Sequence, residues 1–142
     1  MPDRAYDKKC IALSQLETAL GLFSEGQDFF SVITLAGAAD EILGKLVTLR
    51  GGDSSLASLN KAAAAIYEHL FGEPADVSAI AARANRARNA LKHLDPGGRP
   101  TITLDARQEA IDMVNRAIDN YWTLEDSLTP AMEHFAKGLH GT

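Results

Sequence analysis

Hydrophobic residues along this chain recur mostly at intervals of three and four, the spacing that places side chains on one face of an α-helix. The first segment of this kind spans residues 7–25 and is followed by Gly26, a residue type that commonly ends a helix in the left-handed conformation. We therefore predict a first helix over residues 7–25. Its apolar face consists of Leu13, Leu16, Leu20 and Phe23.

The second segment, residues 28–50, is apolar over more than one face, so we predict that it forms the central and most buried helix. Asp28 is a suitable N-cap, and Gly51 with Gly52 would end the helix. Gly37 and Gly44 lie seven residues apart on nearly one stripe. The absence of side chains there would let a neighbouring helix approach closely.

The rest of the chain continues the helical pattern. We predict a short helix over about 59–70, broken by Gly72-Glu73-Pro74, and another from the Asp76 cap over about 77–94. Residues 101–104 are β-branched and follow a proline, so we expect an extended segment without a sheet to join. A fifth helix would begin after Asp105, and a last short helix after Pro130 would cover residues 131–137. The buried face of the fifth helix would consist of Ala110, Val114, Ala117 and Tyr121.

These segments together predict an all-α fold, an antiparallel bundle of about five or six helices with short connections. A length of 142 residues suits one domain, so we expect residues 1–142 to form a single helical domain. The net charge of −5 argues against a broad surface for polyanions. The charged start of the chain does not resemble a secretory signal, and the uncharged run from Phe29 to Ala39 is too short to span a bilayer. We therefore expect a cytoplasmic protein without membrane contact.

Known catalytic and cofactor motifs are missing from the sequence. One cysteine, Cys10, excludes an internal disulfide framework and a multi-cysteine zinc site, and we interpret it as a buried or half-buried small hydrophobic residue. No glycine-rich phosphate loop has the required spacing. The histidines lack ligand spacing, and no Glu-x-x-His pair occurs, so we predict neither a metal nor a cofactor. The four histidines are His69, His93, His134 and His140.

One segment, residues 83–99, has a distinct charge. It carries five basic residues against the single acid Asp95, in a chain that is otherwise strongly acidic. A local positive field of this kind can hold a phosphodiester even when the whole protein is negative. On charge alone, a solvated helix face that pairs with acidic neighbours is the favoured interpretation of the segment. The five basic residues are Arg83, Arg86, Arg88, Lys92 and Arg99.

Within that segment, the residues Arg88-Asn89-Ala90-Leu91-Lys92-His93 lie before a Gly/Pro turn. This order resembles the Arg-x4–6-His motif of HEPN domains (higher eukaryotes and prokaryotes nucleotide-binding), and the helical pattern of the whole chain is similar to that family. The resemblance implies a metal-independent endoribonuclease that works as a homodimer, with both motifs facing one cleft.

In that reading, His93 would be the acid/base catalyst, Arg88 the phosphate clamp and Asn89 a residue that orients one of them or the substrate. RNA would be the substrate, and a toxin or defence role with an antitoxin or other protein partner would follow from the family. The remaining basic residues would bind RNA, namely Arg83, Arg86, Lys92 and Arg99.

Two other interpretations remain open. A HEPN-like bundle without activity would serve as a binding or assembly module. Alternatively, the chain is an unrelated helical protein in which Arg88 and His93 pair with acids such as Asp40, Glu41 or Asp119. A separate expectation concerns assembly: apolar residues of the 28–50 helix and the face bearing Tyr121 and Trp122 should be covered, and any left exposed would mark a partner surface.

Overall fold

The computed structural model describes residues 2–140, which fold into seven α-helices and contain no strand. The all-α architecture is therefore as predicted, with more helices than the five or six expected. The helices are α1 (Lys8–Glu25), α2 (Phe29–Leu49), α3 (Ser55–Phe71), α4 (Val77–Ala84), α5 (Arg86–Lys92), α6 (Ala106–Glu125) and α7 (Pro130–His140).

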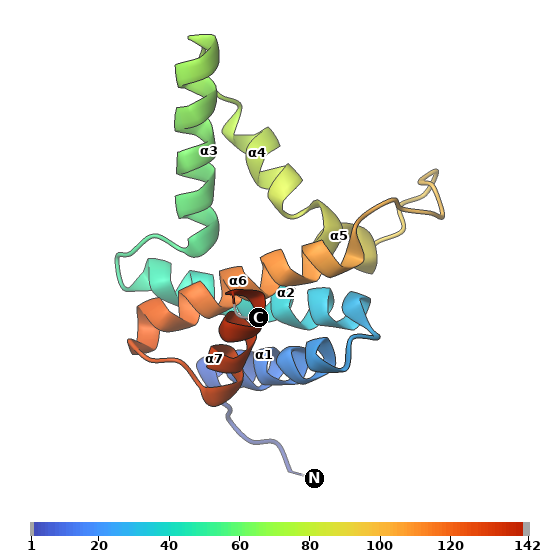
Figure 1. Cartoon of the computed structure of the whole chain (residues 1–142), viewed down its shortest axis with the longest axis vertical. Helices are drawn as coiled ribbons and strands as arrows, with labels where there is room; N and C mark the ends of the chain where they lie inside the picture. Colours follow the sequence, from blue (N-terminus) through green and yellow to red (C-terminus); the bar gives the residue numbers. More distant parts are fainter. Residues whose placement is uncertain (1, 141–142) are drawn as a thin grey trace.

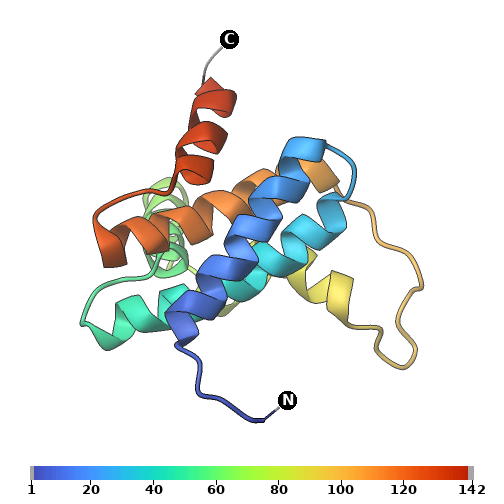
Figure 2. The same cartoon turned by 90° about the horizontal axis from the view of Figure 1, so that it is seen from below.

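Helix α2 forms the centre of the body, as its apolar sequence predicts. Helices α1 and α6 pack against it along most of its length, and α7 packs against α1 (Figures 1 and 2). Burial of apolar surface in this body is the main force that holds the four helices together. The largest fully buried apolar side chains are Leu16, Val32, Ile33, Leu43, Val47, Val114 and Met132.

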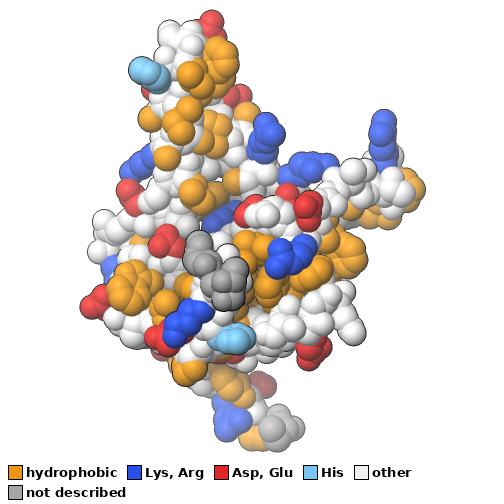
Figure 3. Space-filling model, viewed as in Figure 1, with side chains coloured by type: hydrophobic (Ala, Val, Ile, Leu, Met, Phe, Trp, Pro, Cys, Tyr) orange, Lys and Arg blue, Asp and Glu red, His pale blue; other side chains and the backbone are white. Residues whose placement is uncertain are grey.

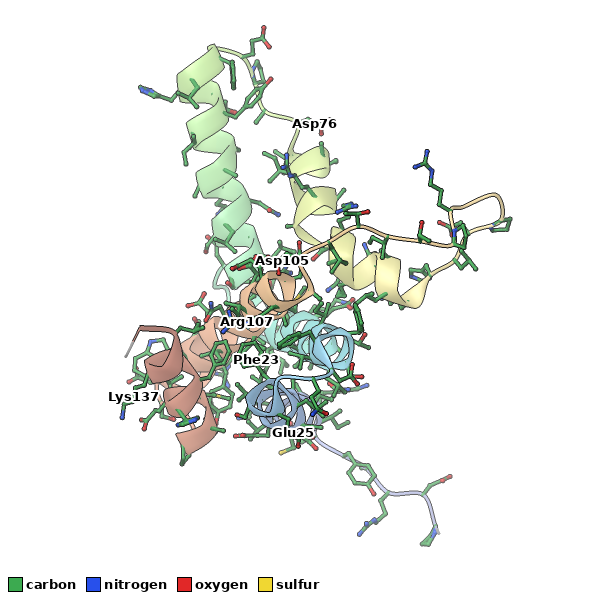
Figure 4. All side chains as sticks on the ribbon, turned by 45° about the vertical axis from the view of Figure 1, so that its right-hand side comes forward. Phe23, Glu25, Asp76, Asp105, Arg107 and Lys137 are labelled. Atoms are coloured by element: carbon green, nitrogen blue, oxygen red, sulfur yellow. The ribbon has the colours of Figure 1, made fainter. Side chains whose placement is uncertain are left out.

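Short polar residues begin most of these helices. Asp28, Asp76 and Asp105 each accept a hydrogen bond from a backbone N–H of the first turn, which confirms the three predicted caps. Figure 4 labels Asp76 at the start of α4 and Asp105 at the start of α6. Gly26 ends α1 with a φ of 70°, also as predicted.

The two glycines of α2 lie where neighbouring segments approach closely, which confirms the prediction from their spacing. A Cβ atom at Gly37 would lie 2.6 Å from the Arg88 Cδ atom, closer than real contacts allow. At Gly44 it would lie 3.3 Å from the Ser54 side chain. The glycines therefore let α5 and the start of α3 pack directly on the α2 backbone.

The predicted helix over residues 77–94 is wrong in one respect, because the chain breaks it at Asn85 into α4 and α5 and ends it at Lys92. A side chain from another helix explains the break. The Arg116 Nη1 atom of α6 donates a hydrogen bond to the Ala84 carbonyl over 3.1 Å, and Nη2 donates to Asn85 Oδ1 over 3.0 Å. These bonds satisfy the end of α4, and α5 begins anew after Asn85.

Helices α3 and α4 rise from the body as an arm joined at its tip (Figure 1). Helix α3 starts at Ser55, earlier than the predicted residue 59. The long connection between α5 and α6 also projects from the body (Figure 2). None of the helices within residues 2–140 combines the length and apolar character that a bilayer crossing needs.

Four exposed side chains bear on the remaining predictions. Cys10 is exposed on α1, so its interpretation as a buried or half-buried residue is wrong. Its position falls on the solvent side of the same helix whose Leu16 and Leu20 enter the core. Tyr121 packs against the core, whereas Trp122 is half-exposed. Most of α2 is covered, with Phe30 and Leu49 as its exposed large residues.

Candidate functional site

Helix α5 and the loop after it enclose an open hollow of about 840 Å³. Two cations, a histidine and an amide contribute to its wall, and one acid, Asp95, does so too. Figure 3 shows Lys and Arg side chains gathered toward this side of the molecule, where the loop projects. The predicted site residues that line this hollow, called here the basic hollow, are Asn89, Lys92, His93 and Arg99.

His93 occupies the C-cap of α5, where the backbone leaves the helix for an extended conformation with φ −129° and ψ 139°. The next residues form a tight turn, in which the Gly98 N–H donates to the Asp95 carbonyl over 2.8 Å and Gly97 adopts a φ of 79°. Pro96 and Gly97 are the residue types that such a turn requires. The turn folds the loop back toward α5 and leaves the His93 side chain exposed at the hollow.

Arg88 lies on the other side of α5. Its side chain packs against Gly37 of α2 and is only 15% exposed, with Nη1 at 4.0 Å from the Glu41 carboxylate. It lines a separate hollow of about 230 Å³ that Glu41 and Lys45 share. The Arg88 Nε atom is buried and makes no hydrogen bond within residues 2–140.

A single chain therefore does not bring Arg88 and His93 into one hollow, although Asn89, which follows Arg88, does line the basic hollow. The two remaining predicted RNA-binding residues are placed apart as well. Arg86 is exposed and reaches the loop through a 3.4 Å hydrogen bond from Nη2 to the Thr103 carbonyl. Arg83 lines a third hollow, between the arm and α6.

A second polar centre lies beneath the arm and is buried. The Arg116 Nη2 atom donates to Asp40 Oδ2 over 2.7 Å, and the Asn120 Nδ2 atom donates to Asp40 Oδ1 over 3.0 Å. All three residues are at most 5% exposed. Burial raises the pKa of the Asp40 carboxyl above its ordinary value, and the Arg116 guanidinium opposes that rise.

This buried network joins four helices. Asn120 Oδ1 accepts the backbone N–H of Ser55 over 2.8 Å, which fixes the start of α3, while Arg116 holds the end of α4. We did not predict the network from the sequence. A usable signal was present, because Arg116 and Asn120 are four residues apart and therefore share one side of α6, next to the face predicted to be buried. The acids named as partners of Arg88 behave differently: Asp40 lines the same hollow but pairs with Arg116, whereas a Glu41 carboxylate oxygen lies 4.0 Å from Arg88 Nη1.

Within residues 2–140, no three His, Cys, Asp or Glu side chains converge in a way that suits a metal ion. No family model matches the sequence, and no curated protein or solved structure is significantly similar to it.

Proposed function

We propose that this protein is a metal-independent endoribonuclease of the HEPN type that acts as a homodimer in the cytoplasm. One observation supports the proposal above the others: exposed His93 shares an open hollow with Lys92, Arg99 and Asn89. A neutral or protonated imidazole beside two cations is the set of groups that RNA cleavage without a metal requires. The all-α fold and the position of the motif at a helix end are compatible with the resemblance.

In the proposed reaction, His93 takes the proton from a ribose 2′-hydroxyl, and the 2′-oxygen attacks the adjacent phosphorus atom. The bond to the 5′-oxygen breaks, and an imidazolium returns a proton to that leaving oxygen. The products are a 2′,3′-cyclic phosphate and a 5′-hydroxyl. Lys92 and Arg99 hold the phosphates on either side of the cut, and Asn89 donates to the substrate.

Arg88 enters this scheme through a second copy of the chain. In one chain it faces α2, away from His93, and its Nε atom is buried, but its guanidinium makes no short ion pair and the side chain lines an open hollow. A phosphate clamp in a cleft shared by two copies uses those donors for the charge of the transition state. Arg88 is therefore proposed to act on the phosphate beside His93 of the other copy.

The test is RNA cleavage in the presence of EDTA by the purified protein, with the product ends identified by their 2′,3′-cyclic phosphates. His93→Ala should lower the rate at least about 100-fold, since acid/base groups contribute on this scale. His69→Ala is the matched control, because His69, like His93, is an exposed histidine near the C-terminal end of a helix. Equal rates for both variants would refute the role of His93, and absence of cleavage in the wild type would refute the nuclease.

A second candidate function is a HEPN-like binding module without activity, such as the partner of another protein in a toxin–antitoxin or defence pair. The placement of Arg88 favours it, because the side chain packs on α2 and lies near Glu41 instead of His93. Arg88→Ala separates the two functions. Because Arg88 packs on α2, the substitution lowers stability in either case; the nuclease also loses cleavage at temperatures where the variant remains folded, whereas the module has no cleavage to remove.

A further inference from the structure

Helix α3 leaves a row of large hydrophobic side chains uncovered. Leu59, Ile66 and Leu70 are 53%, 61% and 66% exposed, and Ala63 between them is exposed too. The half-buried residues of α3 are Leu56, Ala57, Asn60 and Ala64, and the last three of these lie on another side of the helix. We call the row of Leu59, Ala63, Ile66 and Leu70 the α3 seam. Figure 3 shows hydrophobic side chains along the projecting arm that carries it.

The spacing within the α3 seam is four, three and four, which is the alternation by which two helices pair through a coiled-coil contact. The same spacing is obtained when the order is reversed. A second α3 that runs antiparallel therefore matches every seam position, with Leu59 opposite Leu70 and Ala63 opposite Ile66. Each large Ile66 side chain then meets the small Ala63 of the other copy, so the seam complements itself as a two-fold interface requires.

The charge around the α3 seam also favours a second copy. The flanking helix positions hold Asn60, Ala62, Tyr67 and His69, with no Lys, Arg, Asp or Glu. The chain as a whole has a net charge of −5, so two copies repel each other over most of their surfaces. Along the seam, no carboxylate or ammonium of one copy meets its equivalent on the other.

The exposed area is sufficient for a reversible dimer. Roughly 100 Å² on each large seam residue and on the neighbouring Tyr67 and Phe71 gives about 1,000 Å² over two copies, the lower limit for a specific interface. We propose that α3 is a self-association surface, through which two copies pair antiparallel along the α3 seam. This dimer uses neither Arg88 nor His93 and does not rest on the proposed nuclease activity.

Sedimentation of the full chain between about 1 and 300 µM tests the proposal, with a monomer–dimer constant expected on the order of 10 µM for an interface of this size. Ile66→Glu places a charge against Ala63 of the other copy and should weaken the dimer at least about 30-fold. Ala65→Glu is the matched control, because Ala65 is exposed on the same helix away from the seam. Helical content measured by circular dichroism verifies folding, and Leu70→Lys serves as a second seam variant.

The antiparallel direction has its own readout. In a Cys10→Ser background, a mixture of Leu59→Cys and Leu70→Cys chains should form a disulfide-linked dimer under mild oxidation, and neither chain alone should do so. A wild type that stays monomeric to 300 µM overturns the proposal, as does a dimer that both seam variants leave intact. Cross-linking of Leu59→Cys with itself would overturn the antiparallel arrangement. A strictly monomeric wild type would also count against the shared cleft of the proposed nuclease, whereas the effects of the seam variants and the cysteine cross-links bear on the α3 seam alone.

Discussion

Two polar regions of this molecule use similar side chains in opposite ways. In the buried network, the two terminal nitrogens of the Arg116 guanidinium donate to Asp40, Asn85 and a backbone carbonyl, while its buried Nε atom has no hydrogen-bond partner among the described residues. In the basic hollow, Lys92, His93 and Arg99 lie at the surface around an open space, with no ion pair among the described residues. A buried charge must be paired to be tolerated, whereas an exposed one remains available to a ligand.

This difference in burial and pairing distinguishes residues that stabilise the fold from residues that are available to bind a ligand. Arg116 joins helices that are distant in sequence, so its loss should affect folding first. The basic hollow is formed by one helix end and one loop, and its charges should contribute little to the stability of the fold. Arg88 lies between these cases, because it is largely buried but makes no short ion pair.

The largest effect on stability is expected from Asp40→Ala. The substitution removes the acceptor of both Arg116 and Asn120 and leaves a buried cation without its partner, which costs about 3–5 kcal/mol of unfolding free energy. Urea denaturation at pH 7 measures this. Asp119→Ala, at an exposed position of the same face of the body, should remain close to wild type. A small cost for Asp40→Ala would mean that the network does not hold the arm to the body.

A smaller effect is expected from Gly37→Ala, which forces the added methyl group against the Arg88 side chain at 2.6 Å. Overpacking of this kind costs about 1–3 kcal/mol. In an Arg88→Ala background the cost should vanish, so a double-mutant cycle measures how strongly Arg88 is held against α2. Gly21→Ala is the control, because nothing lies within 4 Å of its added methyl group and helix propensity should make it stabilising. Equal costs of Gly37→Ala in both backgrounds would contradict the contact.

A pH dependence is expected from Asp40 itself. Because burial raises its pKa in the folded state, the folded protein keeps this proton to a higher pH than the unfolded chain does. Its stabilising contribution is complete below the ordinary value of 3.8 and is lost as the pH rises through the raised folded-state pKa. Asp40→Asn has no such titration, so the wild type should lose stability relative to this variant as the pH rises above 3.8 towards the raised folded-state pKa. The opposite slope would show that attraction to Arg116 outweighs burial.

The smallest effect on stability is expected in the basic hollow. Lys92→Ala and Arg99→Ala should leave the unfolding midpoint unchanged, and each should weaken single-stranded RNA binding by a few-fold. A plot of the logarithm of the RNA-binding constant against the logarithm of the salt concentration should become shallower by about 0.7 for each lost phosphate contact. Lys61→Ala provides the control, since Lys61 is an exposed cation that pairs with Asp53 on the arm. An unchanged salt dependence in both hollow variants would exclude the basic hollow as the RNA site.

The sequence by itself determined the helices and their ends, because these depend on local chemistry. The apolar spacing marked α1, α2 and α6, and Asp28, Asp76 and Asp105 marked helix starts, since a cap bonds only to backbone a few residues away. The Pro96-Gly97 turn, which joins Asp95 to Gly98 at the edge of the basic hollow, follows from the same kind of local preference.

The tertiary structure alone decided the break at Asn85, the pairing of Asp40 with Arg116 and the separation of Arg88 from His93. Each depends on side chains that are brought together across long stretches of chain, and a local pattern carries no information about such partners. Arg116 reaches Ala84 over an interval of 32 residues and Asp40 over 76. Arg88 and His93 are close in sequence, yet α2 packs against one side of α5 and the loop folds back on the other, so packing assigns the two residues to different hollows.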